Sequence, residues 1–148
     1  EPIYSIFRQV CSAPTLTAHG VEANGDKWSL PQIADAVKPV LVQHAAESDV
    51  ALAALVDERR GQRRATTDLA DIARAATISA VATLIVDREY DERGTIGDDG
   101  SLSLDPGGPV IAEELARRVV ANGGRVLALA ADRLPGGSPI TAVLRYAQ

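Results

Sequence analysis

The sequence contains no methionine and a single cysteine, Cys11, among its 148 residues. One cysteine cannot form a disulfide within the chain, which favours a reducing compartment. The missing methionine predicts that the sequence is a piece of a longer protein, or a processed one. No signal-peptide pattern is present and no apolar run is long enough to span a bilayer, so we expect a cytoplasmic protein that does not contact a membrane.

Aromatic residues and surplus positive charge are also scarce. Aromatics make up 3% of the chain and the net charge is −5. Few rings are therefore available to stack on nucleic-acid bases, and phosphate binding over the whole surface is disfavoured. A local basic patch remains compatible with this charge. Apolar residues, mainly Ala, Val and Leu, make up 46%, which predicts a folded chain of helices and short buried strands.

The first part of the chain is predicted to be mostly helical. EPIYSIFRQVC has the apolar spacing of a short helix, and TLTAHGVEA is strand-like. Ser29 and Gln32 form a capping box with Pro31 in the first turn, so a long helix begins there and ends near Gly61. Pro39 predicts either a kink in this helix or the start of a second one.

The second part alternates between helical and strand patterns. AVATLIVD, RVLALAA and ITAVLRY predict buried strands, and RGTIGDDGSLSLD predicts a hairpin or flap. One helix is capped at Thr67 or Asp68, and another runs from Pro109 to Asn122. The spacing of Glu113–Arg117 and of Glu114–Arg118 supports the later helix. The order predicts a layered α/β domain, with its boundary in the charged segment DERRGQRRATTD.

Two aspartates follow apolar strands in this domain. If the strands before Asp87 and Asp132 are parallel, both carboxylates lie at the edge of the sheet where α/β proteins bind ligands. A Mg²⁺ or phosphate site beside the PGGSP loop is one interpretation. The other, which we prefer, is that each Asp begins a turn or caps a helix. The loop itself lacks the Lys and the spacing of a P-loop.

One dense basic segment stands out in the sequence. It contains Arg59, Arg60, Arg63 and Arg64, and Arg133 lies in the later DRLPGGSP loop. These guanidinium groups would suit RNA phosphates or an acidic partner. They equally suit the solvated end of a helix, where cations interact favourably with the helix dipole. The residues alone leave both interpretations open.

Three segments together resemble a known family, the archaeal and eukaryotic class-1 peptide-chain release factors. DLADIARAATISAVATLIVD is similar to the opening of that family's C-terminal domain, and IAEELARRVVANGGRVLAL to its later helix and strand. The ending GGSPITAVLRY is similar to the family's last strand, with Leu144, Arg145 and Tyr146 matching its end. EPIYSIFRQV and the long helix resemble the end of the middle domain. The bacterial branch of the family is the most similar.

The resemblance implies a fold and a division of the chain. Residues 1–62 would be the last helix, strand and long helix of the middle domain, and residues 63–148 a three-layer α/β/α domain like that of ribosomal proteins that bind kink-turn RNA. Arg145 and Tyr146 would then be structural residues at the sheet rim. The family hydrolyses peptidyl-tRNA with a Gly-Gly-Gln loop, but this chain has Arg60-Gly61-Gln62 at a helix end. We therefore expect no catalysis and no cofactor.

The function predicted from the sequence is interaction. The resemblance implies docking to the ribosome or to a translational GTPase, with weak RNA binding at most because of the negative charge. One alternative is a fragment of a ribosome rescue or hibernation factor that hydrolyses nothing. Another is a small Mg²⁺-dependent phosphate enzyme that uses Asp87 and Asp132. A third is a true kink-turn RNA binder, for which the loop offers only Arg133.

Overall fold

The computed structural model describes Cys11, Gly20, Val21 and residues 27–147. The chain forms two compact units, Glu1–Val50 and Ala51–Gln148. The short helix and the strand expected before residue 26 lie outside the described residues, apart from three isolated positions. The second unit contains the sheet and all of the residues predicted to form a site.

Helix α2, Leu30–Gly61, is the longest element. Gln32 Oε1 accepts hydrogen bonds from the backbone N–H and from the hydroxyl of Ser29, at 2.9 and 3.0 Å, which confirms the start of the helix predicted from the capping box. The helix continues through Pro39 as one element, so a second helix does not begin there. Its end at Gly61 is also confirmed.

The second unit contains a mixed sheet of four strands in the order β1-β6-β2-β5. Strand β6 is antiparallel to both β1 and β2, whereas β2 and β5 are parallel. The strands are β1 (Ala65–Thr66), β2 (Val81–Asp87), β5 (Arg125–Leu129) and β6 (Ile140–Leu144). Three of them match the predicted strands; β1 was not predicted, because two residues carry no periodic pattern.

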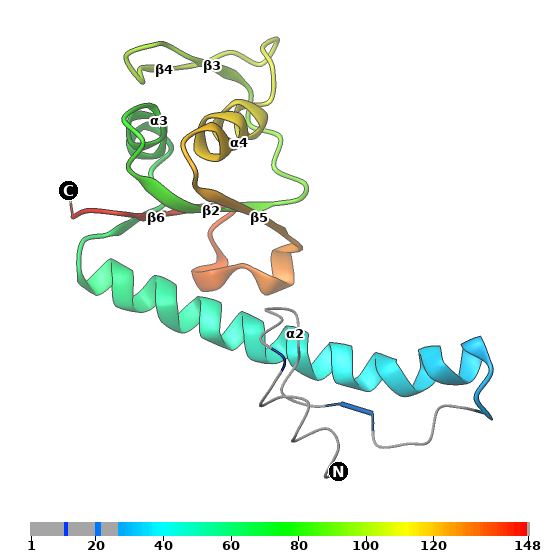
Figure 1. Cartoon of the computed structure of the whole chain (residues 1–148). Coiled ribbons are helices and arrows are strands. Elements are labelled where there is room, and N and C mark those ends of the chain that lie inside the picture. The colour runs from blue at the N-terminus through cyan, green and yellow to red at the C-terminus, as the bar shows by residue number, and fades with distance from the viewer. Residues whose placement is uncertain (1–10, 12–19, 22–26, 148) are drawn as a thin grey trace. The chain divides into compact units, whose positions relative to one another are not determined.

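Helices cover both faces of this sheet (Figure 1). On one face lie α3 (Leu69–Thr77) and α4 (Ile111–Ala121), whose apolar residues join the main core with Leu84, Val86 and Ala142. On the other face Val56 of α2 packs with Ile85 and Val143. The alternation along β2 explains this division, since successive side chains of a strand point to opposite faces. The predicted layered α/β domain is thus confirmed.

The predicted N-terminus of α3 is confirmed as well. Asp68 caps the helix, and its carboxylate accepts a hydrogen bond of 2.9 Å from the N–H of Asp71. In α4, Arg118 pairs with Glu114 as predicted, but Arg117 pairs with Glu114 instead of Glu113. Both arginines converge on one carboxylate because residues three and four positions apart share a helix face.

The predicted hairpin consists of β3 (Gly94–Ile96) and β4 (Leu102–Leu104), paired antiparallel. The Arg118 side chain links this hairpin to α3 and α4 through hydrogen bonds. Its guanidinium donates to the carbonyls of Ile96 and Gly97 at 2.8 and 3.0 Å, to Thr77 Oγ1 at 2.7 Å, and to Glu114 Oε1 at 2.7 Å. The Arg118 side chain is only 13% exposed, so these charge-assisted bonds are shielded from water. One side chain therefore joins the hairpin to α3 and α4.

The packing of α2 on the sheet leads to a stability prediction. Val56 is 1% exposed, so Val56→Ala should leave a cavity between α2 and the sheet and lower the free energy of unfolding by about 2 kcal/mol. Val50→Ala is the matched control, because Val50 lies on the same helix and is 71% exposed. Urea unfolding of both variants measures the difference. Equal losses would show that α2 does not contribute to the core of this unit.

The Arg118 cluster leads to a prediction about pH. Hydrogen bonds from Arg117 and Arg118 lower the pKa of Glu114 from 4.5 to about 2. A carboxylate whose pKa is lower in the folded state stabilises the fold above its unfolded pKa and loses that effect as the pH falls. Stability from this group should therefore be complete above about pH 4.5 and disappear toward pH 2. In Glu114→Gln the unfolding free energy should be lower at pH 7 and depend less on pH across this window. An unchanged pH slope in the variant would contradict the prediction.

Candidate functional site

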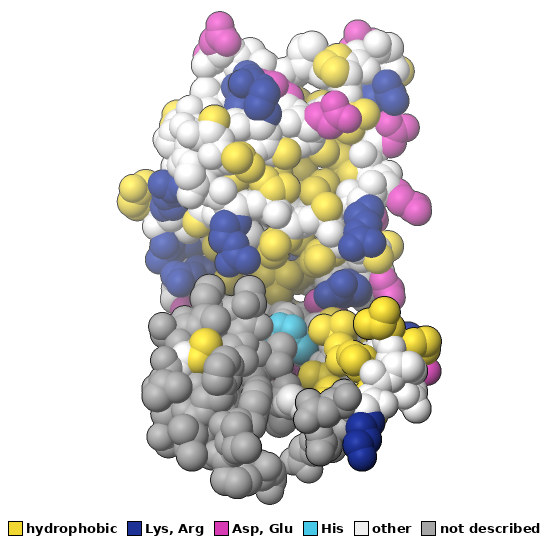
Figure 2. All heavy atoms as spheres, turned by 45° about the vertical axis from the view of Figure 1, so that its right-hand side comes forward, with side chains coloured by type: hydrophobic (Ala, Val, Ile, Leu, Met, Phe, Trp, Pro, Cys, Tyr) yellow, Lys and Arg dark blue, Asp and Glu magenta, His cyan; other side chains and the backbone are white. Residues whose placement is uncertain are grey.

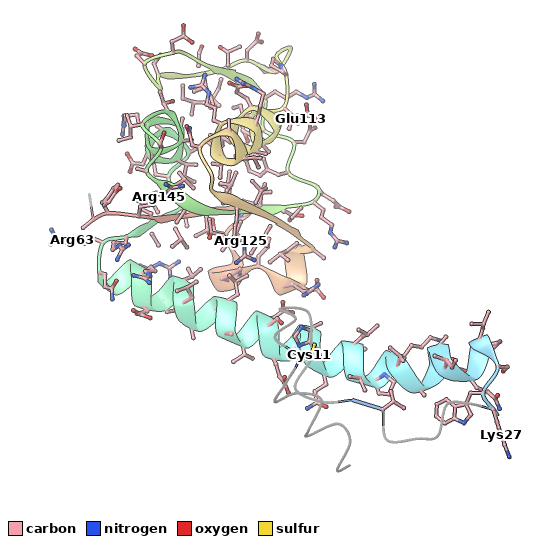
Figure 3. All side chains as sticks on the ribbon, viewed as in Figure 1. Cys11, Lys27, Arg63, Glu113, Arg125 and Arg145 are labelled. Atoms are coloured by element: carbon pink, nitrogen blue, oxygen red, sulfur yellow. The ribbon has the colours of Figure 1, made fainter. Side chains whose placement is uncertain are left out.

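The four clustered arginines lie at the end of α2 and in the loop to β1. Arg59 and Arg60 belong to the last turn of the helix, where cations interact favourably with the helix dipole. Arg63 follows the helix with a positive φ of 56°, and Arg64 directly precedes β1. Figure 3 shows the Arg63 side chain directed away from the sheet. The structure thus keeps the four side chains in one region but gives them different surroundings.

The four guanidinium groups differ in their partners. Arg59 donates to Gln62 Oε1 at 3.1 Å, and Arg60 pairs with Asp57 at 3.4 Å. The Arg63 guanidinium makes no hydrogen bond or ion pair within the part of the chain that the structure describes. Arg64 instead donates to the main-chain carbonyl of Arg145, and its Nε atom is buried. Arg64 is therefore a structural residue, whereas Arg59, Arg60 and Arg63 remain available to a partner.

Arg60 also lies beside the glycine-rich loop. A Cβ atom placed on Gly136 would lie 3.3 Å from Arg60 Nη2, so the guanidinium rests against this turn. Gly136 has a φ of 69°, a left-handed conformation that favours glycine. The loop carries Arg133 in the short 3-10 helix η2, Ala131–Arg133, where its side chain is half-buried and already engaged. Two features that are 76 positions apart in sequence, Arg60 and the Gly136 turn, therefore meet in the fold.

The basic end, as we call Arg59, Arg60 and Arg63, has a defined chemistry. Guanidinium groups bind phosphates and carboxylates through paired N–H donors and stay charged at all accessible pH values. Asp57 and Glu58 lie in the same turns of α2 and weaken the positive field. The second unit contains neither lysine nor histidine, so its cationic side chains are all arginines. The basic end is suited to recognising a few anionic groups, not a long phosphate backbone.

The two aspartates lie where the sequence predicted them. Because β2 and β5 are parallel, Asp87 and the residues after Leu129 lie at the same edge of the sheet. Asp87 Oδ1 accepts a hydrogen bond of 3.0 Å from the N–H of Glu89, which is the arrangement of an Asx turn. Asp132 lies in η2. Within the described ranges, no three His, Cys, Asp or Glu side chains converge as metal ligands. The turn role accounts for Asp87.

The Arg-Tyr pair at the end of the chain divides into two roles. Arg145 Nη2 donates to the carbonyl of Asn122 at 2.8 Å, and its N–H donates to the carbonyl of Ala80 at 2.8 Å. These bonds join the end of β6 to the end of α4, in agreement with the structural role expected of Arg145. Tyr146 is 69% exposed and contributes little to the core.

An acidic hollow of about 320 Å³ lies beside the hairpin. It is open to solvent, and its walls come from two segments, Asp91–Arg93 and Leu104–Pro106. Arg93 pairs with Asp91 at 3.1 Å and so neutralises part of its charge. Exposed carboxylates of this kind keep their hydration, and no buried polar group points into the hollow from the residues that line it. Among the residues that line the hollow there is no His, Cys or Ser beside the carboxylates.

The comparisons with known proteins agree with this geometry. The model of the bacterial archaeo-eukaryotic release factor family 3 matches residues 1–78, which is more than half of the chain. The chain belongs to this family. The family model ends just after α3, so the match does not cover α4 or the strands that follow α3. No curated protein matches the sequence. Among the described residues, no helix is long and apolar enough to cross a membrane.

Solved structures extend the likeness to the second unit. The C-terminal domain of a peptide chain release factor from Methanosarcina mazei is 13% identical with a TM-score of 0.59, and the match covers 85% of this chain and 99% of that one. Dom34 of S. cerevisiae, a translation termination-like factor, is 18% identical with a TM-score of 0.56. Ribosome-bound archaeal Pelota is 17% identical with a TM-score of 0.53.

The extent of these matches defines what they show. They cover 81% of this chain for Dom34 and 84% for Pelota, but only 34% of the length of either relative. At such low identities the likeness shows the fold alone. The family-3 chain thus has a release-factor-like α/β domain with a long helix before a mixed four-stranded sheet, as its resemblance to the class-1 release factors implied.

Asp87 and Asp132 lead to a prediction that distinguishes a Mg²⁺ site from a role of each Asp in a turn or cap. Millimolar Mg²⁺ should leave the melting temperature unchanged, because two carboxylates without a third ligand provide too few oxygens for a stable site. Asp132→Asn should melt like the parent chain, whereas Asp87→Ala should melt lower because it loses the Asx turn. Asp87→Asn, which keeps the acceptor, is the matched control. Stabilisation by Mg²⁺ that disappears in both Asn variants would instead support the phosphate-enzyme alternative.

Proposed function

We propose that this chain is a non-catalytic docking part of a release-factor-like protein that binds the ribosome or a translational GTPase. The observation that carries the proposal is the family match over residues 1–78 combined with the fold of a release factor's C-terminal domain. Two proteins of the same fold have partners of this kind: archaeal Pelota is ribosome-bound together with ABCE1, and Dom34 interacts with Hbs1.

The basic end is the surface that we propose for contact. The Arg63 side chain has no partner among the described residues, and the ion pair of Arg60 with Asp57 is long and largely exposed. An exposed pair of this kind contributes little stability, so Arg60 can exchange its partner at small cost. The basic end has few guanidinium groups, and the chain as a whole is acidic. It can therefore bind a small number of anionic groups, such as those of one acidic protein surface or of a short run of rRNA phosphates. Kink-turn RNA binding stays an alternative, and weak RNA binding at most stays the prediction.

The proposed lack of catalysis is supported by the position of Gln62. Gln62 Nε2 donates to Glu58 Oε1 at 2.9 Å, and its Oε1 accepts from Arg59. Both ends of the amide are therefore engaged with the last turn of α2. Gln62 therefore takes part in the hydrogen bonds at the end of a helix and does not lie in a Gly-Gly-Gln sequence. Arg60-Gly61-Gln62 is thus better suited to ending the helix than to hydrolysis.

Sedimentation with bacterial ribosomes that carry peptidyl-tRNA tests the proposal. The chain should pellet with the ribosomes, and the peptide should stay attached to its tRNA. Arg59→Ala/Arg60→Ala/Arg63→Ala should weaken binding at least tenfold and reduce its salt dependence, by a slope of about 0.7–0.9 for each phosphate that the variant no longer neutralises. Arg74→Ala/Arg117→Ala is the matched control, because both side chains are more than 60% exposed and lie on α3 and α4.

Three results of this experiment would decide against parts of the proposal. Binding that appears only after a purified translational GTPase is added would identify that protein, and not the ribosome, as the contact. Release of the peptide would contradict the proposed lack of catalysis. No binding under either condition would contradict docking as a whole.

A further inference from the structure

The free edge of β5 carries an inference that goes beyond docking through the basic end. Strand β5 is the last strand in the order β1-β6-β2-β5, and no described strand pairs with its outer side. The carbonyl of Leu129 faces β2, because it accepts a hydrogen bond of 2.8 Å from the N–H of Arg88. Backbone groups alternate in direction along a strand. The N–H and carbonyl groups of Val126 and Ala128 therefore point outward, away from the sheet.

These outward groups are accessible and nearly unpaired. Ala128 is exposed, and Val126 is half-buried. Only the Ala128 carbonyl has a side-chain partner, Arg88 Nε at 3.3 Å, and Arg88 is itself exposed. An extended peptide placed here would find two N–H donors and two carbonyl acceptors in the geometry of a missing strand.

The side chains around the edge define the charge of its occupant. Arg125 begins β5 and is exposed, and its guanidinium makes no hydrogen bond or ion pair within the described part of the chain. Arg88 lies at the other end of the strand. Figure 3 shows Arg125 on the side of the sheet opposite α3 and α4, the side to which Leu127 and Leu129 also belong. The two arginines are about 10 Å apart along the strand, at about 3.3 Å per residue.

The surface between the arginines is apolar. Leu127 and Leu129, on the same face as Arg125, pack against the core that contains Val56 but are only half-buried, whereas Val126 packs on the opposite face. In Figure 2, which brings the β5 side of Figure 1 forward, hydrophobic side chains gather in the middle of this unit and Arg side chains lie on both sides of them. An apolar centre with cationic ends complements a segment that has an apolar centre and anionic ends.

We propose that the outer edge of β5 binds an extended acidic segment of a partner protein as an additional strand. Its backbone pairs with Val126 and Ala128, its central apolar side chain covers the half-buried leucines, and carboxylates at its two ends pair with Arg125 and Arg88. A second copy of this chain fits less well. Antiparallel pairing of two β5 strands about Leu127 would bring the Arg125 of one copy toward the Arg88 of the other, and like charges in contact are repulsive.

The test uses the full chain and a fluorescein-labelled peptide, Glu-Thr-Val-Thr-Glu, whose two carboxylates and central apolar side chain share one face, with Lys-Thr-Val-Thr-Lys as the charge control. Ala128→Pro removes one outward N–H without removing a bond to β2, and proline is tolerated at this position of an edge strand. Ala128→Val keeps the N–H and is the matched control. Arg88→Gln/Arg125→Gln tests the charges separately, so the experiment does not depend on the folding of the proline variant.

Binding of the acidic peptide should shift the amide NMR signals of Val126 and Ala128 more than others. Affinity should fall at least tenfold in Ala128→Pro and in the double Gln variant, stay unchanged in Ala128→Val, and be lost for the Lys peptide. Equal binding to Ala128→Pro, or shifts confined to the basic end, would overturn the proposal. So would a parent chain that binds no peptide while the double Gln variant self-associates, because the arginines would then only protect the edge. None of these outcomes depends on ribosome binding.

Discussion

The second unit depends on burying the central strands on both faces. Leu84 and Ile85 are adjacent in β2 and both are 0% exposed, although they point to opposite sides of the sheet. A strand with this pattern needs two apolar covers. Helices α3 and α4 provide one, and the last turns of α2 provide the other through Val56. The long helix thus precedes the α/β domain in the chain and also contributes to its core.

Arginine side chains fasten the periphery to this core. Arg118 holds the hairpin, Arg145 joins β6 to α4, and Arg64 holds the main chain after β6. In each case a planar guanidinium satisfies main-chain carbonyls that a helix or strand end would otherwise leave unpaired. Arginine is accordingly used here as a structural crosslink, whereas Arg63 and Arg125 have no such task within the described part of the chain.

Much of the fold could be predicted from the sequence, because its elements have strong local signals. Apolar runs predicted β2, β5 and β6, and Asp68 and the Ser29 capping box predicted helix starts. The rest depends on long-range pairing. Strand β1 exists because β6 pairs with it. Contact between α2 and the sheet could not be predicted either, since a composition change near residue 63 says nothing about where the preceding helix packs. The domain boundary placed there stays a prediction.

The candidate site shows the same division. The sequence indicated Arg59, Arg60 and Arg63 because they are clustered in the chain, and their availability became clear only from their partners. Arg88 and Arg125 could not be predicted as site residues, because they are isolated in sequence. Only the strand order shows that they lie at the two ends of an edge strand. An Asp after an apolar strand suits both a ligand and a turn residue, and in the structure the Asp87 carboxylate closes a local turn.

The absence of lysine and histidine from residues 51–148 determines how the charge of this unit depends on pH. Carboxylates are ionised above about pH 5 and tyrosines stay neutral below about pH 10, while guanidinium groups never lose their proton in this range. The charge pattern is therefore constant between about pH 5 and about pH 10. Acetylation and ubiquitination of side-chain amines also have no target among residues 51–148, so a modification that changes the charge of this unit would have to act on other groups, such as its Ser, Thr and Tyr hydroxyls.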